Sequence, residues 1–139
     1  MMKKTVFSMI AILTVSLLLV GCGTSGHRDA EKEDIGYQQI SQEKAMEMMK
    51  SEKDYLIVDV RTPEEYAAGY IKHAINIPNE TIDKEGPKQL KDKDRLIFVY
   101  CRSGNRSKEA SDKLARMGYT KVYEMGGINT WKGDIVKGK

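Results

Sequence analysis

Residues 96–107 read LIFVYCRSGNRS, and the apolar run from Leu96 to Tyr100 leads directly into Cys101. A short continuous apolar run is typical of a strand buried on both faces, as in a parallel sheet. The residues after Cys101 are small or basic and lead into a segment with apolar residues at helical spacing. This segment predicts a helix that ends at Gly118 and buries Ala110, Leu114 and Met117.

Segments on both sides of this stretch repeat the alternation of strands and helices. Thr62 begins a capping box with Glu65, and Pro63 stands at the first helical position. Alternation at this spacing predicts an α/β fold with a central, mainly parallel sheet of about five strands and helices on both faces. We expect further strands at 37–40, 56–60, 74–77 and 121–124, helices after Ser41, after Thr62 and around Trp131, and a loop with a weak helix over 81–93.

The amino-terminal segment has the pattern of an export signal. Lys3 and Lys4 precede an apolar run of about 15 residues, which is short for a membrane span of about 20 residues. The sequence Leu-Val-Gly-Cys at 19–22 resembles the lipobox of bacterial lipoproteins. That resemblance implies cleavage after residue 21, acylation of Cys22 with palmitate or a similar chain, and anchoring at the extracytoplasmic face of the cell membrane. The alternatives are an uncleaved anchor helix and a plain secreted protein.

The domain organisation follows from these features. We expect a signal peptide at 1–21, a flexible tether at 22–36 that begins at the lipidated Cys22, and one folded domain at 37–139. His27 lies in the tether and has no neighbouring metal-ligand residues. Without Lys3 and Lys4 the chain has 21 basic and 20 acidic residues, a balance that gives no sign of nucleic-acid binding.

Cys101 is the candidate reactive group. It follows the predicted strand 96–100, and ligands in open α/β sheets bind beyond the carboxyl ends of strands. If Cys22 is lipidated, Cys101 is the only free thiol of the mature chain. At a helix amino terminus beside arginines, a thiol pKa of about 8.5 can fall to about 3.5–7.5, and no Cys/His pair is then needed. The other histidine, His73, is expected in a turn.

Several motifs in one order resemble the rhodanese family. They are Cys-Arg-Ser-Gly-Asn-Arg-Ser at 101–107, Asp-Val-Arg-Thr-Pro-Glu-Glu-Tyr at 59–66, Ala-Ile-Asn-Ile-Pro at 74–78, and Gly126, Gly127 and Trp131. The resemblance covers residues 37–135. The sequence departs from the family's common Gly-His-Ile-Pro-Gly-Ala pattern, because Tyr70 and His73 replace the usual His and second Gly.

The resemblance implies a sulfurtransferase that moves a sulfane sulfur from thiosulfate, or a related small anion, to a thiol or to cyanide. Cys101 would carry the sulfur as a persulfide, without a metal or cofactor. The Arg102 and Arg106 side chains would attract the anionic donor, and Asp59 and Arg61 would form a supporting charge pair at a strand end. The persulfide would be held by the backbone amides of Arg102, Ser103, Gly104, Asn105, Arg106 and Ser107.

Two other functions stay open. A persulfide carrier or binding module in the cell envelope would pass sulfur between protein partners, and the sequence does not identify such a partner. A phosphatase or arsenate reductase would also use a loop cysteine and arginine. Those enzymes resemble Cys-x5-Arg, whereas four residues separate Cys101 from Arg106 here, and the shorter loop suits a single sulfur atom better than a tetrahedral phosphate.

Overall fold

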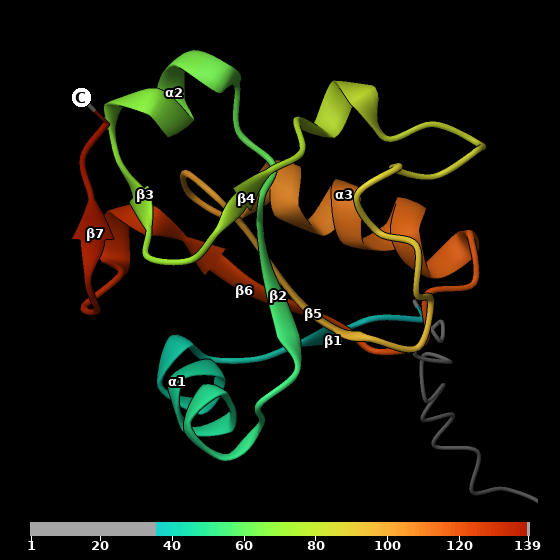
Figure 1. Cartoon of the computed structure of the whole chain (residues 1–139), viewed down its shortest axis with the longest axis horizontal. Helices are drawn as coiled ribbons and strands as arrows, with labels where there is room; N and C mark the ends of the chain where they lie inside the picture. The colour runs from blue at the N-terminus through green and yellow to red at the C-terminus, as the bar shows by residue number, and fades with distance from the viewer. Residues whose placement is uncertain (1–35, 139) are drawn as a thin grey trace, which may run out of the picture. The chain divides into compact units, whose positions relative to one another are not determined.

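The computed structural model describes residues 36–138, which form one α/β unit (Figure 1). The predicted leader, the tether, Cys22 and His27 lie outside the described residues. Between residues 36 and 138, no helix combines the length and the apolar character needed to cross a membrane.

A five-stranded parallel sheet forms the centre of the domain, in the order β1-β6-β5-β2-β4. The sheet therefore has the predicted strand number and direction. The central strand β5 is buried at every position, as its apolar sequence predicts. The strands are β1 (Gln38–Gln39), β6 (Val122–Gly127), β5 (Leu96–Cys101), β2 (Tyr55–Asp59) and β4 (Ile75–Asn76).

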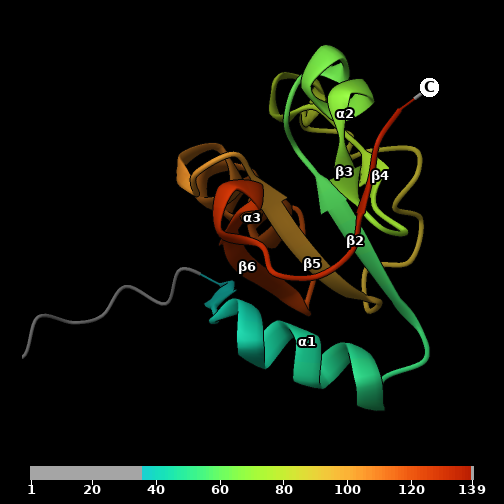
Figure 2. The same ribbon diagram turned by 90° about the vertical axis from the view of Figure 1, so that its left-hand side faces the viewer.

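Helices cover both faces of this sheet. Helices α1 (Gln42–Ser51) and α3 (Asn105–Arg116) lie on opposite sides of the strands in Figures 1 and 2. Side chains of β5 alternate between the two apolar cores: Ile97 and Val99 pack with Ala110 and Leu114 of α3, whereas Phe98 and Tyr100 pack with Ala45 of α1. This alternation follows from the two-residue period of a strand.

Helix caps match the sequence signals. Ser41 accepts a hydrogen bond from the Lys44 amide at the start of α1. Helix α2 (Pro63–Ala68) begins with the complete capping box, in which Thr62 and Glu65 satisfy each other's backbone amides. Such boxes fix where a helix begins, so α2 starts at a defined distance from the end of β2.

Two predicted helices are wrong. The segment 81–93 has no α-helix, and a 3-10 turn at Asn79–Thr81 ends at its first residue. No α-helix forms because Gly86 and Pro87 interrupt the segment and its apolar residues lack helical periodicity. Trp131 follows a second 3-10 turn at Ile128–Thr130 and has an extended backbone. The chain then passes Gly133, where a Cβ would lie 2.7 Å from Trp131 Nε1.

A small antiparallel ribbon was not predicted. Strand β3 (Tyr70–Ile71) pairs with β7 (Ile135–Val136), close to the carboxyl terminus of the domain (Figure 1). Each strand has two residues, too few for an alternating pattern to be visible in the sequence. Strand β6 also continues through Gly127, beyond its predicted end at Glu124.

Candidate active site at the Cys101 loop

Cys101 is the last residue of β5, and its side chain lies at the carboxyl end of the sheet with 1% of its surface exposed. The chain leaves the strand through Arg102 and Ser103 and reverses at Gly104, whose φ of +116° lies in a region that favours glycine. Helix α3 begins at the next residue. The first amides of a helix have no intrahelical acceptor, so this turn directs free N–H groups toward the sulfur.

The surroundings of the thiol favour its ionised form. The Gly104 amide donates to Cys101 Sγ at 3.0 Å. Burial acts to raise the pKa of the Cys101 thiol, but hydrogen bonds from the Ser107 side chain and from the amides of Ser107, Gly104 and Ser103 outweigh it and lower that pKa below its ordinary value. Donors that point at sulfur stabilise the thiolate over the thiol.

Gly127 holds the other side of the loop. It pairs with Cys101 in the sheet register, beside an irregularity in β5. A Cβ at Gly127 would overlap the Arg102 carbonyl and lie 2.6 Å from Ser103 Cα. The Gly127 carbonyl accepts the Gln42 side-chain amide at 2.7 Å, which ties the start of α1 to the same point. The loop therefore rests directly on backbone that has room only for glycine.

Arg106 does not extend freely into solvent. Its guanidinium donates two hydrogen bonds to Glu65, at 2.7 and 2.9 Å, and each side chain is 30% exposed. The bond to Arg106, with the Thr62 amide, lowers the pKa of Glu65 to about 2. A large part of the Arg106 charge is thus neutralised by the capping box of α2, and sequence alone gave no sign of this pairing.

The other predicted loop residues divide into exposed and buried groups. Arg102, Ser103 and Asn105 have exposed side chains, and Gly104 and Ser107 are buried. Among residues 36–138, the Arg102 guanidinium has no hydrogen-bond or ion-pair partner. Arg102 is therefore the loop cation that a small anion approaching Cys101 meets without first displacing a carboxylate.

Asp59 and Arg61 form a buried ion pair beneath α2. The guanidinium donates to both carboxylate oxygens, and its Nη2 also donates to the Gly69 carbonyl at 2.6 Å, at the end of α2. Asp59 is fully buried and accepts the Tyr100 hydroxyl at 2.6 Å. Burial and the bond to Asp59 raise the pKa of Tyr100. These partners are all protein groups, as expected for a pair that ties the strand end to the helix.

Glu124 belongs to the site and was missed. Its carboxylate is 4% exposed and accepts the Ser107 hydroxyl at 2.6 Å and the Gly126 amide at 2.8 Å. Ser107 Oγ in turn lies 3.4 Å from Cys101 Sγ. The one available signal was a carboxylate at the carboxyl end of a predicted strand, a position that in this fold borders the ligand site.

A cavity opens beside the loop. Its volume is about 680 Å³, and its walls include Ser103, Gly104, Lys108 and Glu124, together with Ser41, Gln42 and Glu43 at the start of α1. Lys132 adds a second cation to this wall. The cavity gives solvent and small polar molecules access to the back of the loop.

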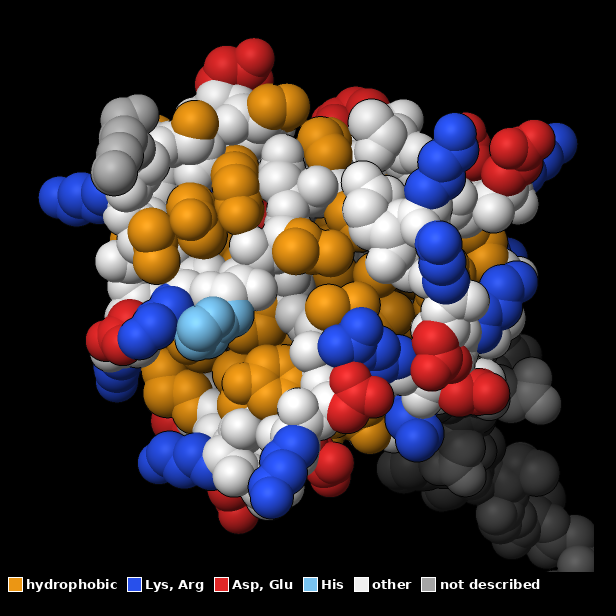
Figure 3. Space-filling view, in the orientation of Figure 1, with side chains coloured by type: hydrophobic (Ala, Val, Ile, Leu, Met, Phe, Trp, Pro, Cys, Tyr) orange, Lys and Arg blue, Asp and Glu red, His pale blue; other side chains and the backbone are white. Residues whose placement is uncertain are grey.

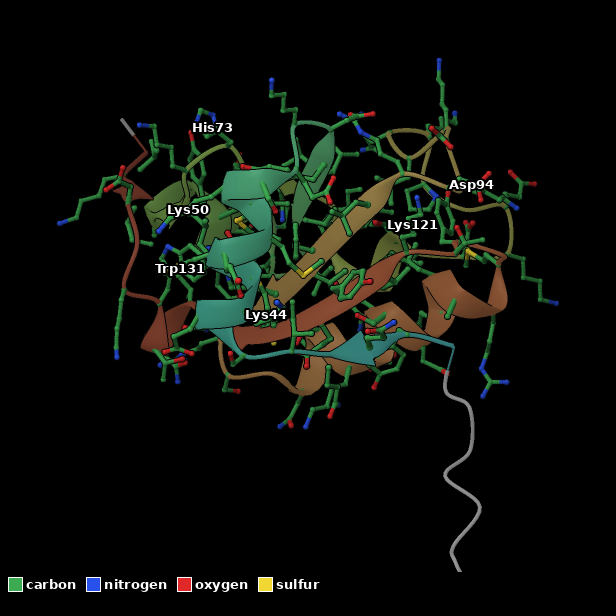
Figure 4. All side chains as sticks on the ribbon, turned by 90° about the horizontal axis from the view of Figure 1, so that it is seen from below. Lys44, Lys50, His73, Asp94, Lys121 and Trp131 are labelled. Atoms are coloured by element: carbon green, nitrogen blue, oxygen red, sulfur yellow. The ribbon has the colours of Figure 1, made fainter. Side chains whose placement is uncertain are left out.

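The histidine of the described chain lies elsewhere. His73 is exposed in the turn between β3 and β4 and has a φ of +71° (Figures 3 and 4). No group of three or more His, Cys, Asp or Glu residues suited to a metal ion occurs within residues 36–138. Figure 3 also shows acidic and basic side chains mixed over the face in view, rather than one basic surface.

Together, the sheet and the loop define a class: α/β proteins that carry a reactive cysteine between a central parallel strand and a helix amino terminus. Within that class, this chain belongs to the rhodanese-like family, whose domain model, described as Rhodanese-like domain, matches residues 41–134.

The comparisons with individual proteins agree. The chain is 37% identical over 81 residues to thiosulfate sulfurtransferase PspE of Escherichia coli, covering 58% of this chain and 78% of that one. It is 38% identical over 96 residues to a sulfurtransferase of Allochromatium vinosum, covering 67% and 86%. The crystal structure of a rhodanese-related protein from Thermoplasma volcanium superposes with a TM-score of 0.61 at 31% identity, covering 72% of this chain and 98% of that one. The chain is therefore homologous to sulfurtransferases.

Proposed function

We propose that this protein transfers sulfane sulfur from thiosulfate, or a related small anionic donor, to a thiol acceptor, with Cys101 as the carrier. The observation that carries the proposal is the Cys101 sulfur held 3.0 Å from the Gly104 amide at a helix amino terminus, with a lowered thiol pKa. The relationship to thiosulfate sulfurtransferase PspE supports thiosulfate as the donor.

The reaction has two displacements at sulfur. In the first, the Cys101 thiolate attacks the outer sulfur of thiosulfate; a new S–S bond forms, the S–S bond of thiosulfate breaks, and sulfite leaves with the electron pair. In the second, the acceptor attacks the outer sulfur of the persulfide, and the electron pair returns to Cys101 Sγ. The thiolate is regenerated, and no net oxidant is consumed. The amides of residues 102–107 hold the terminal sulfur anion between the two steps.

Transfer from thiosulfate to cyanide by the purified protein tests this function. Thiocyanate production that disappears in Cys101→Ser is the expected result, and production that survives this change excludes Cys101 as the carrier. Turnover of p-nitrophenyl phosphate would favour the phosphatase alternative. Sulfur uptake on Cys101 without turnover would favour a persulfide carrier.

We also propose that Cys22 carries a lipid that holds the domain at the extracytoplasmic face of the membrane. The support is the sequence pattern alone, since Cys22 lies outside the described residues. Intact mass of the mature protein from its membrane fraction tests this: the expected chain begins at Cys22 with acyl chains attached. A chain that begins elsewhere, or carries no lipid, contradicts the anchor.

A further inference from the structure

The Cys101 thiol is almost fully surrounded by protein, so its proton first meets a protein group. The side chain is 1% exposed, and the histidine among residues 36–138 is His73, in the exposed turn between β3 and β4 (labelled in Figure 4). A lowered pKa favours the thiolate, but the proton still needs a group to receive it. The side chain that meets Sγ is Ser107, with its Oγ placed 3.4 Å away to accept from the thiol.

Ser107 also forms a hydrogen bond with Glu124. Its Oγ lies 2.6 Å from Glu124 Oε1, within the range of hydrogen bonds to an ionised oxygen. The Gly104 carbonyl also lies 2.8 Å from Ser107 Oγ, but it receives the Lys108 amide at 3.2 Å. A carbonyl oxygen accepts two hydrogen bonds, so the single hydroxyl proton of Ser107 can point at either oxygen, and Glu124 Oε1 is the nearer one. With the proton directed there, Ser107 Oγ has a lone pair for the thiol.

Glu124 connects this contact to solvent. It forms no ion pair among the residues the structure describes, and its fixed partners are the Ser107 hydroxyl and the Gly126 amide. It also lines the 680 Å³ cavity beside the loop, whose charged neighbours are Glu43, Lys108 and Lys132. A proton on Glu124 therefore borders this cavity, whereas Cys101 is not among the residues that line it.

We infer that Ser107 and Glu124 form a proton relay that serves Cys101, with Glu124 as a positioning residue that acts through the serine. The relay rests on the proposed function only in its purpose, which is to prepare the sulfur nucleophile. The S–H bond breaks and an O–H bond forms on Ser107 Oγ, while the original serine proton moves to Glu124 Oε1. The sulfur keeps its electron pair, and the negative charge moves from the carboxylate to the thiolate.

The relay and a passive buried charge predict opposite effects of Glu124→Gln. Glutamine can accept the same hydrogen bonds but takes up no proton, so the relay predicts slower formation of a reactive sulfur. If Glu124 were merely a nearby negative charge, its removal would favour the thiolate, and reactivity at neutral pH would rise. The sign of the change therefore separates the two.

The experiment is the rate of Cys101 alkylation by iodoacetamide at pH 7, in water and in deuterium oxide. Glu124→Gln should lower the rate by at least about tenfold. This is less than the usual effect of a proton-transfer group, about 10²–10⁴-fold, because the loop amides already lower the pKa of the thiol. The change should also abolish a normal solvent isotope effect seen in the unaltered protein. Ser107→Ala should do the same, and the double variant should react no more slowly than either single one. Glu109→Gln, on the exposed side of α3, is the matched control and should change nothing.

An unchanged or faster rate in Glu124→Gln overturns the relay. If that variant does not fold, the solvent isotope effect on alkylation of the unaltered protein decides the question, and its absence overturns the relay. Alkylation requires no sulfur transfer, so the two proposals fail separately. Protein that takes no sulfur from thiosulfate but still depends on Glu124 refutes the sulfurtransferase proposal, whereas sulfur transfer with no dependence on Glu124 refutes the relay.

Discussion

The guanidinium of Arg106 and the carboxylate of Glu65 are joined by two hydrogen bonds, of 2.7 and 2.9 Å. Glu65 also closes the capping box of α2 by accepting the Thr62 amide at 3.0 Å. One carboxylate therefore fixes both the start of α2 and the first turn of the helix that follows Cys101. The loop is held between two helix starts, which keeps its amides directed at the sulfur.

Replacing Glu65 with Gln should destabilise the domain by about 1–2 kcal/mol at pH 7, since paired hydrogen bonds between charged groups are strong but these groups are partly exposed. The folded pKa of Glu65 is lowered from 4.5 to about 2, so its contribution is complete above pH 4.5 and is lost as pH falls toward 2. Urea unfolding across this range should show the two proteins converging at low pH. Glu64→Gln, exposed on the same turn, is the control; a constant difference at all pH values contradicts the assignment.

Arg102→Ala should weaken donor binding without unfolding the domain. The side chain is exposed, and one favourable charge contact near 4 Å in water is worth about 1 kcal/mol, or about a fivefold rise in KM for thiosulfate. Added salt should narrow the difference. Arg116→Ala also removes one positive charge, at the far end of α3, about 16 Å along the helix from Asn105; Arg116 pairs with Asp112 there. Equal effects of both changes would show that only net charge matters.

Gly127→Ala should lower the rate of sulfur transfer by more than its loss of stability explains. Its Cβ would meet the backbone of Arg102 and Ser103, so the loop must move away from β6. We expect at least a tenfold loss of sulfur transfer per folded molecule, because small displacements of catalytic geometry have large effects on rate. Gly118→Ala is strained by its φ of +94° but meets only a lysine side chain. It should lose stability and keep its activity, and activity retained in Gly127→Ala would refute the role of Gly127 in holding the loop.

Asp59→Asn should unfold the domain readily and leave the thiol chemistry of the folded fraction intact. The change leaves the buried Arg61 charge uncompensated, which costs about 3–5 kcal/mol. Asp54→Asn is the control. Asp54 is 78% exposed and pairs with Arg95, so this change should lower the free energy of unfolding by less than about 1 kcal/mol. Urea unfolding gives both values. A stable Asp59→Asn with a lost sulfur-transfer rate would instead assign Asp59 to substrate.

Much of the architecture follows from local sequence. The run 96–100, the capping box at Thr62 and the helix cap at Ser41 each predict their elements, because burial and capping act on neighbouring residues. The ribbon between β3 and β7 was missed because each strand has two residues and the partners are 64 or more positions apart. Such pairing depends on the whole fold rather than on a local pattern.

The candidate site divides in the same way. Cys101 and its loop could be recognised because a strand end, small residues and a helix start are adjacent in the sequence. The contacts of Arg106 with Glu65, and of Ser107 with Glu124, join residues 41 and 17 positions apart. Surface and buried carboxylates look alike in sequence, so these partners emerged only when the packing was known.

The most direct test is the intact mass of the purified protein, measured after exposure to thiosulfate and again after cyanide is added. A thiol kept ionised by the amides at the start of α3 should gain the mass of one sulfur atom and lose it again on adding cyanide, and Cys101→Ser should gain nothing. A domain that keeps its original mass with thiosulfate and with every other sulfane donor tried would contradict the account.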